Sequence, residues 1–142
     1  MTAREAAETA AHHRVLIVDD EESMRLFLAR ILTTVLKAEV TLAGTSEQAL
    51  RLAGNNVYDA ILLDLLMPGT GGYEVLKEIR LASPNVATPV IIVSLLADKS
   101  TQERCMKAGA TAYVIKPIER NSFVATVKSQ IAGRGKPKLK GK

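Results

Sequence analysis

The sequence of 142 residues contains a single cysteine, Cys105, no tryptophan and only 4% aromatic residues. One cysteine excludes a framework of intramolecular disulfide bonds and is typical of proteins in a reducing compartment, so we expect a cytoplasmic location. No apolar run reaches the roughly 18 residues that a membrane-spanning helix requires. Residues 1–13 also lack the apolar segment of a secretory signal peptide. We therefore expect a globular protein without a membrane partner.

Charge is unevenly distributed along the chain. The formal net charge is +4, from 19 basic and 15 acidic residues, yet the last ten residues contain five of the basic residues and no acidic one. Residues 1–132 therefore carry 14 basic and 15 acidic residues, and the high isoelectric point belongs to the C-terminal end. We predict three segments: a flexible arm over residues 1–13, one folded domain over residues 14–132 and a basic disordered tail over residues 133–142.

Five short apolar runs alternate with five segments of helical periodicity. Continuous apolar runs indicate strands that are buried on both faces, as in a parallel sheet covered by helices. The alternation predicts a doubly wound α/β fold with right-handed crossovers. We expect strands at residues 15–18, 40–43, 60–63, 90–93 and 112–115, and helices at residues 22–37, 45–54, 72–82, 100–108 and 122–132. The pattern Thr45-x-x-Gln48 predicts a capping box at the start of the second helix, and Gly54 predicts its end.

Polar or charged residues follow four of the five expected strands. Asp19 and Asp20 follow the first strand, and Asp64 follows the third. Ser94 follows the fourth strand, and Lys116 follows the fifth. Ligands of open α/β sheets bind beyond the carboxyl ends of the strands, so these side chains mark the expected site. If the first and third strands are neighbours, three carboxylates converge there and their repulsion requires a cation. Mg²⁺ fits best, because it accepts a few carboxylates and keeps several water ligands.

Each of these residues has a purely structural interpretation when it is taken alone. An aspartate after a strand is most often a helix cap or turn former, Ser94 a cap, and Lys116 part of a solvated turn. Their joint occurrence at four strand ends favours a binding site instead. Open metal positions could hold phosphate oxygens, with Lys116 and Ser94 on the far side of the phosphate. Asp64 could then act as a nucleophile that takes a phosphoryl group as an acyl phosphate.

Four stretches of the sequence carry a resemblance to a known family. They are Val15-Leu16-Ile17-Val18-Asp19-Asp20, Asp64-Leu65-Leu66-Met67-Pro68 together with Gly72, Ser94, and Tyr113-Val114-Ile115-Lys116-Pro117. Over residues 14–132 the chain resembles the receiver domain of bacterial two-component response regulators. The resemblance implies a flavodoxin-like fold, with a five-stranded parallel sheet in the order 2-1-3-4-5 and helices on both faces.

The resemblance also implies roles for the acidic residues. Asp64 would be the phosphoacceptor, charged by a phosphohistidine on a sensor histidine kinase or phosphotransfer protein. Asp20, Asp64 and the backbone carbonyl of Leu66 would bind Mg²⁺ directly, and Asp19 would act largely through water. Such a domain assists its own phosphoryl transfer and dephosphorylation, and it is not an enzyme that acts on an external substrate.

Three further residues would form the switch of such a domain. Lys116, expected to precede a cis peptide bond to Pro117, would contact the phosphoryl group. Ser94 would move toward that group, and Tyr113 would rotate inward to fill the space left. The face formed by the last two expected helices and the last expected strand would then bind a downstream protein target, or a second copy of the chain.

The chain departs from the family pattern beside the expected site. Leu66 and Leu96 stand two residues after Asp64 and Ser94, at positions that flank the path of the hydrolytic water in this family. Apolar side chains cannot orient water, so we expect a long-lived phosphoryl-aspartate. Leu95 occupies a position that is usually small, which leaves its effect on the switch open.

Other interpretations of the sequence remain open. The chain could be the receiver part of a larger DNA-binding regulator or of a hybrid kinase. The basic tail could attract nucleic acid, but it has no aromatic residue for base stacking, so we favour a solvated arm. A hydrolase that works through an aspartyl phosphate would need an additional cap region, for which this chain has little room.

Overall fold

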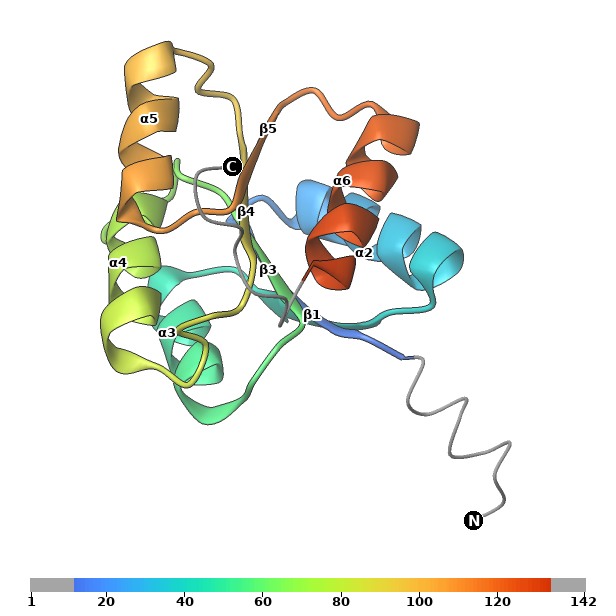
Figure 1. Ribbon diagram of the computed structural model, residues 1–142, viewed down its shortest axis with the longest axis horizontal. Coiled ribbons are helices and arrows are strands. Elements are labelled where there is room, and N and C mark those ends of the chain that lie inside the picture. Colours follow the sequence, from blue (N-terminus) through green and yellow to red (C-terminus); the bar gives the residue numbers. More distant parts are fainter. Residues whose placement is uncertain (1–11, 134–142) are drawn as a thin grey trace.

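The computed structural model describes residues 12–133, in which five strands alternate with five helices (Figure 1). The strands are β1 (Arg14–Val18), β2 (Glu39–Ala43), β3 (Ala60–Leu63), β4 (Val90–Ser94) and β5 (Ala112–Ile115), and the helices are α2 (Glu22–Leu36), α3 (Ser46–Asn55), α4 (Gly72–Ala82), α5 (Lys99–Ala108) and α6 (Arg120–Ala132). Most of the predicted N-terminal arm and of the predicted basic tail lies outside the described residues. Within the described range, no helix combines the length and apolar character that crossing a bilayer would require.

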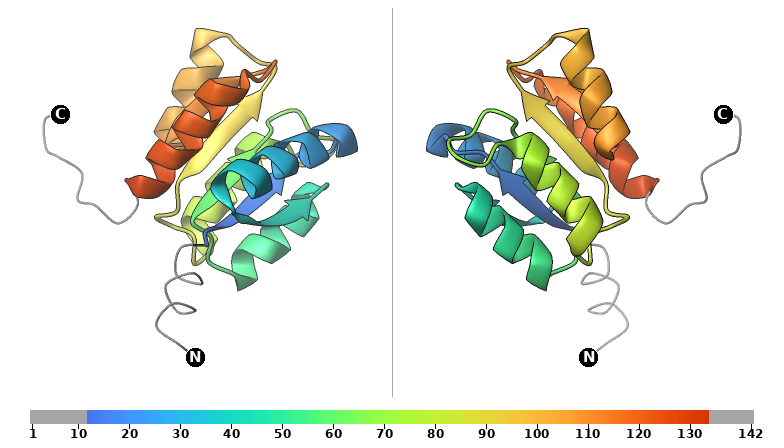
Figure 2. Two further views of the ribbon diagram at one scale, coloured as in Figure 1. Left: turned by 90° about the vertical axis from the view of Figure 1, so that its right-hand side faces the viewer. Right: turned by 90° about the vertical axis from the view of Figure 1, so that its left-hand side faces the viewer.

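The strands form one parallel sheet in the order β2-β1-β3-β4-β5. This confirms the predicted doubly wound, flavodoxin-like architecture. α2 and α6 cover one face of the sheet, and α3, α4 and α5 cover the other (Figures 1 and 2). Open α/β sheets bind ligands in a crevice beyond the carboxyl ends of the strands where the winding reverses, which in this sheet is between β1 and β3.

The central strands are buried on both faces, as their continuous apolar runs predict. Leu16 and Val18 of β1 pack in the core layer beneath α3 and α4, whereas Val15 and Ile17 pack in the layer beneath α2 and α6. All four residues of β3 are buried. Burial of each such side chain contributes roughly 1.5–3 kcal/mol, so two separate hydrophobic layers hold the ends of β1 and β3 in place.

The start of α3 follows the predicted capping pattern, with one difference. The Thr45 hydroxyl accepts a hydrogen bond from the Gln48 N–H at 3.1 Å, as an N-cap residue should. The Gln48 side chain accepts from the N–H of Gly44 at 2.9 Å, not from that of Thr45. The cap is therefore present, but its reciprocal contact is displaced by one residue toward β2.

The predicted end of α3 at Gly54 is wrong, because the helix continues to Asn55. The side chains of Asn55 and Asn56 donate to the carbonyls of Arg51 and Leu52, at 2.8 and 2.9 Å. The bond to Leu52 satisfies one of the last four carbonyls of the helix, and α3 ends at an extended Asn56 without a glycine in the left-handed conformation.

Asn85 joins the α3–β3 and α4–β4 connections at the edge of the sheet where the strands begin. The residue is fully buried, and its amide donates to the carbonyls of Ala53 and Asn56, both at 2.7 Å. Its side-chain oxygen accepts from the Tyr58 N–H at 2.9 Å and from the Thr88 hydroxyl at 3.0 Å. All hydrogen-bonding positions of the amide are therefore used inside the protein.

Arg80 extends this network from α4 to the start of β5. Its guanidinium donates twice to the carbonyl of Gly109, at 2.7 and 3.0 Å, and also to the carbonyls of Asn85 and Val86. Gly109 ends α5 as predicted, with a φ of 114° that favours glycine. The edge opposite the crevice is thus tied together by side chains that bind backbone carbonyls.

Replacement of Asn85 should be strongly destabilising. Asn85→Ala leaves buried backbone donors and acceptors without partners, and we expect a loss of about 2–4 kcal/mol in the free energy of unfolding, measured by urea denaturation. The control is Asn55→Ala, which removes one exposed hydrogen bond and should change stability by no more than about 0.5 kcal/mol. Equal effects of the two substitutions would contradict the role of Asn85 as a buried hub.

Candidate functional site

The carboxyl ends of β1 and β3 bring the three predicted aspartates together. Oxygen atoms of Asp19, Asp20 and Asp64 all lie within 4.8 Å of one another. The sheet ladder itself positions two of them, because the Asp19 N–H donates to the carbonyl of Ala43 and the Asp64 N–H donates to that of Val18. Residues 45 apart in the sequence therefore meet because their strands are neighbours in the sheet.

Two of the carboxylates are buried, and one buried cation faces both. Asp19 and Asp64 are 2% and 5% exposed, whereas Asp20 is exposed. The Lys116 ammonium lies 2.9 Å from Asp19 Oδ2 and 3.5 Å from Asp64 Oδ2, and its side chain is 8% exposed. The sequence analysis placed Lys116 near a phosphate. In the structure it forms ion pairs with the carboxylates, and the peptide bond that joins it to Pro117 is cis, as expected.

Burial and neighbouring charges shift the pKa values of Asp64 and Lys116. Burial raises the pKa of the Asp64 carboxyl above its ordinary value, although the Lys116 charge and the hydrogen bond from the Leu66 N–H act in the opposite direction. Burial alone would lower the pKa of Lys116, but the hydrogen bond to Asp19 and the charge of Asp64 outweigh it and raise this pKa. Lys116 therefore stays protonated at neutral pH, and it is the buried cation that faces the carboxylates.

The backbone orients both buried carboxylates in the same way. Asp19 Oδ1 accepts from the Glu21 N–H at 2.9 Å, and Asp64 Oδ1 accepts from the Leu66 N–H at 3.3 Å. Each aspartate thus bonds to the N–H two residues ahead, as in an Asx-turn, and turns its other oxygen toward Lys116. The contacts of Asp64 are the longer ones in both cases, so its oxygens are held less tightly than those of Asp19.

Gly72 allows α4 to begin directly against the Asp64 backbone. The Gly72 N–H donates to the carbonyl of Leu65 at 3.2 Å. A Cβ atom at this position would lie 2.0 Å from the Asp64 carbonyl oxygen, which is far inside van der Waals contact. Sequence analysis noted Gly72 as part of a family pattern. Only the structure gives its reason, which is space for the backbone that carries Asp64.

Ser94 and Tyr113, two of the three predicted switch residues, are hydrogen-bonded to the backbone of the same residue at the ends of β4 and β5. The fully buried Ser94 hydroxyl accepts from the Leu96 N–H at 3.2 Å. The half-buried Tyr113 hydroxyl donates to the carbonyl of Leu96 at 2.6 Å. Leu96 thus links the two side chains through its backbone, a role that sequence analysis missed because backbone contacts leave no signature in residue type. Leu66 and Leu95 are exposed.

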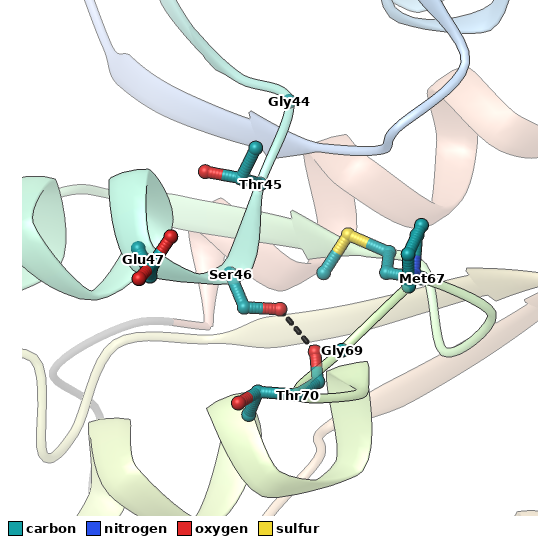
Figure 3. Close-up of a pocket in the computed structure, with 8 residues that line it drawn as sticks. Gly44, Thr45, Ser46, Glu47, Met67, Gly69 and Thr70 are labelled. Carbon is teal, nitrogen blue, oxygen red and sulfur yellow. Dashed lines mark hydrogen bonds between the residues drawn. The ribbon is translucent and has the colours of Figure 1, made fainter.

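A cavity of about 340 Å³ lies between the β2–α3 turn and the β3–α4 loop (Figure 3). Residues 44–47 line one side of it and residues 67–70 line the other. The Ser46 hydroxyl donates to the carbonyl of Thr70 across this space (Figure 3). None of the clustered aspartates lines the cavity, so the cavity is separate from the acidic cluster.

The chemistry of the cluster fits a hard divalent cation. Three carboxylates that share one region carry more negative charge than a single ammonium can offset. Carboxylate and carbonyl oxygens are the ligands that Mg²⁺ prefers, and one exposed carboxylate leaves the cluster accessible from solvent. The residues that could hold the ion are Asp19, Asp20, Asp64 and the carbonyl of Leu66.

Residues 15–128 match the model of the response regulator receiver domain family. A probable transcriptional regulator, ycf27 of Cyanidium caldarium, is 35% identical over 88% of this chain and 49% of its own length. The sensory/regulatory protein RpfC of Xanthomonas campestris is 36% identical over 80% of this chain and 16% of its own length. The chain thus spans half or less of each of these relatives.

A solved structure of a receiver domain shares the fold. The receiver domain of the sensor histidine kinase PA1611 from Pseudomonas aeruginosa superposes with a TM-score of 0.78 and 30% identity, covering 86% of this chain and 99% of that one. That structure has a magnesium ion coordinated in its active site cleft.

A methyl group at Gly72 should displace the backbone at Asp64. We expect Gly72→Ala to lower the free energy of unfolding by about 1–3 kcal/mol and to shift the amide NMR signals of residues 63–66. The matched control is Gly54→Ala on α3, where a Cβ would meet nothing within 4 Å. The control should raise stability by about 0.5–1 kcal/mol, because alanine is the better helix former. A neutral effect of Gly72→Ala would contradict the steric argument.

Proposed function

The chain belongs to the response regulator receiver domain family, and we propose that Asp64 is its phosphoacceptor in a site that binds Mg²⁺. The observation that carries this proposal is the position of Asp64, buried between two further aspartates and Lys116 at the crevice where the winding of the sheet reverses. The phosphoryl donor would be a phosphohistidine on a sensor histidine kinase or on a phosphotransfer protein.

The distances favour Asp64 over its neighbours as the nucleophile. Asp19 has both oxygens in short contacts of 2.9 Å, to the Glu21 N–H and to Lys116. The corresponding contacts of Asp64 are 3.3 and 3.5 Å, so its lone pairs are less occupied. Asp20 is exposed and lacks the buried surroundings that exclude water from an acyl phosphate. Asp19 and Asp20 are therefore assigned to the metal.

Phosphoryl transfer in this site is a simple displacement. A carboxylate oxygen of Asp64 attacks the phosphorus of the phosphohistidine, the phosphorus–nitrogen bond breaks, and the imidazole leaves with its electron pair. Asp19, Asp20, Asp64 and the carbonyl of Leu66 would hold Mg²⁺, which when bound neutralises charge on the phosphoryl oxygens. Lys116 supplies a second positive charge, and a break of one of its ion pairs frees it to bind the phosphoryl group.

The output of the domain would be a change in the hydrogen-bonded group around Leu96. A phosphoryl group on Asp64 offers Ser94 an acceptor, and movement of Ser94 opens space that Tyr113 can fill. These residues lie beneath the face formed by α5, β5 and α6, where Met106 and Ile115 are exposed. We assign this face to a downstream protein target, or to a second copy of the chain.

The wider context of the domain is also a proposal. The relatives include a probable transcriptional regulator and a sensory/regulatory protein, so the domain would serve either in a DNA-binding regulator or in a hybrid kinase. We place it in the cytoplasm, where its phosphohistidine donors act, and we assign it no external substrate. The basic tail, for which we propose no nucleic-acid role, lies almost wholly outside the described residues.

The direct test is labelling with acetyl phosphate in the presence of Mg²⁺, read by intact mass. We expect the parent protein to gain one phosphoryl group, and Asp64→Asn to gain none. Asp59→Asn makes the same chemical change where β3 begins, far from the site, and should be labelled like the parent. Chelation of Mg²⁺ should abolish labelling. Full labelling of Asp64→Asn would contradict the proposal.

The apolar side chains of Leu66 and Leu96 should slow the loss of the phosphoryl group. We expect Leu66→Asn and Leu96→Glu to accelerate decay of the labelled protein by roughly tenfold, which corresponds to about 1.4 kcal/mol of activation free energy. A time course of intact mass after removal of the donor measures this rate. Leu81→Asn, at an exposed position on α4, is the control and should decay like the parent. Unchanged decay in both variants would contradict the proposed effect of Leu66 and Leu96 on loss of the phosphoryl group.

A further inference from the structure

Arg25 of α2 reaches back to the turn that carries two of the aspartates. Its Nη1 donates a hydrogen bond of 2.6 Å to the backbone carbonyl of Asp19. The same guanidinium lies against Gly44, where a Cβ atom would stand 2.8 Å from Nη1 and 3.2 Å from Cζ. One side chain therefore contacts both the β1–α2 turn and the β2–α3 turn.

We propose that Arg25 is a positioning residue for the metal site, and that it holds Asp19 and Asp20 in place by clamping their turn against Gly44. The inference rests on the proposed binding of Mg²⁺ by these aspartates. The proposed role requires no contact of Arg25 with the ion or with the phosphoryl group. Its contact is with a backbone oxygen, so it acts through the path of the chain between β1 and α2.

The β1–α2 turn needs such support because its helix begins without a side-chain cap. Glu21 stands at the N-cap position of α2 and makes no capping hydrogen bond with its side chain. The turn is held instead by the Glu21 N–H, which donates to Asp19 Oδ1, and by the Arg25 guanidinium on the Asp19 carbonyl. The first of these bonds uses a carboxylate oxygen of the site itself. Loss of the second would leave the turn held by the first, so a shift of the backbone would move the Asp19 carboxylate with it.

The absence of a side chain at Gly44 leaves the space that the Arg25 guanidinium occupies. It follows Ala43, which pairs with Val18 at the end of the β1–β2 ladder, so Gly44 and Asp19 are adjacent across the sheet. Its N–H donates to the Gln48 side chain, which connects Gly44 to α3. Any side chain at position 44 would occupy the space of the guanidinium. The position is therefore small for a reason that depends on Arg25.

The positive charge of Arg25 predicts the opposite effect of its removal on Mg²⁺ affinity. A cation near three carboxylates would repel Mg²⁺, so its removal would tighten metal binding if charge dominated. Removal of a positioning contact would weaken metal binding; loss of a direct hydrogen-bond partner of a ligating side chain typically costs 10–100-fold in affinity, and we expect the lower end of this range for a contact through the backbone. Substitution by an uncharged side chain that cannot donate a hydrogen bond separates the two explanations.

The test compares Arg25→Met, Arg25→Lys and the control Arg30→Met, which changes an exposed arginine of the same helix. Titration calorimetry measures Mg²⁺ affinity, and circular dichroism checks that each variant is folded. We expect about tenfold weaker binding for Arg25→Met, an intermediate value for Arg25→Lys, and the parent value for the control. Equal or tighter binding by Arg25→Met would overturn the inference.

Gly44→Ala tests the clamp from its other side. In the parent background it should weaken Mg²⁺ binding severalfold, because the methyl group displaces the guanidinium. In the Arg25→Met background it should have no further effect, since the group that it displaces is gone. An equal effect of Gly44→Ala in both backgrounds would overturn the coupling.

A readout without metal separates failure of this inference from failure of the proposed function. Hydrogen exchange at the Glu21 amide reports the bond to Asp19 directly, and Arg25→Met should accelerate it severalfold relative to amides of β3. If the parent protein does not bind Mg²⁺, the proposed function fails, while this exchange rate still decides whether Arg25 holds the turn. Unchanged exchange at Glu21 would overturn the positioning role.

Discussion

The ammonium of Lys116 between the carboxylates of Asp19 and Asp64 is the contact on which the site depends. Burial of two carboxylates at one sheet edge is costly, and a single buried cation offsets only part of that cost. The two ion pairs are unequal, at 2.9 Å and 3.5 Å. Asp19 is therefore held more tightly by Lys116 than Asp64 is, and this difference is the basis for proposing Asp64 as the nucleophile.

The side of the sheet where the strands begin and the side where they end differ in how completely their polar groups are paired. At the edge where strands begin, Asn85 and Arg80 satisfy buried carbonyls with neutral and cationic donors, and the result is a fully bonded network. At the edge where strands end, like charges are gathered and left partly uncompensated. A protein can hold such an unfavourable cluster only if the rest of the fold is rigid, and the two apolar layers around β1 and β3 together with the network at Asn85 provide that rigidity.

The sequence predicted most of the fold, because continuous apolar runs and helix periodicity are local signals. All ten elements were expected, and the main error, at Gly54, arose where asparagine side chains replaced the usual glycine cap. The convergence of the aspartates followed from the strand order. The contacts of Lys116, the clamp of Arg25 and the backbone role of Leu96 were beyond prediction, because they depend on distances between atoms that no residue pattern encodes.

The hydrogen bonds at Leu96 use its backbone and leave its side chain independent of them. Ser94 and Tyr113 are joined through the N–H and the carbonyl of this residue, which every amino acid except proline offers equally. The side chain of Leu96 takes no part in these two hydrogen bonds. Under the proposed function, a polar side chain in place of this leucine would change the lifetime of the phosphoryl group and leave both backbone hydrogen bonds in place.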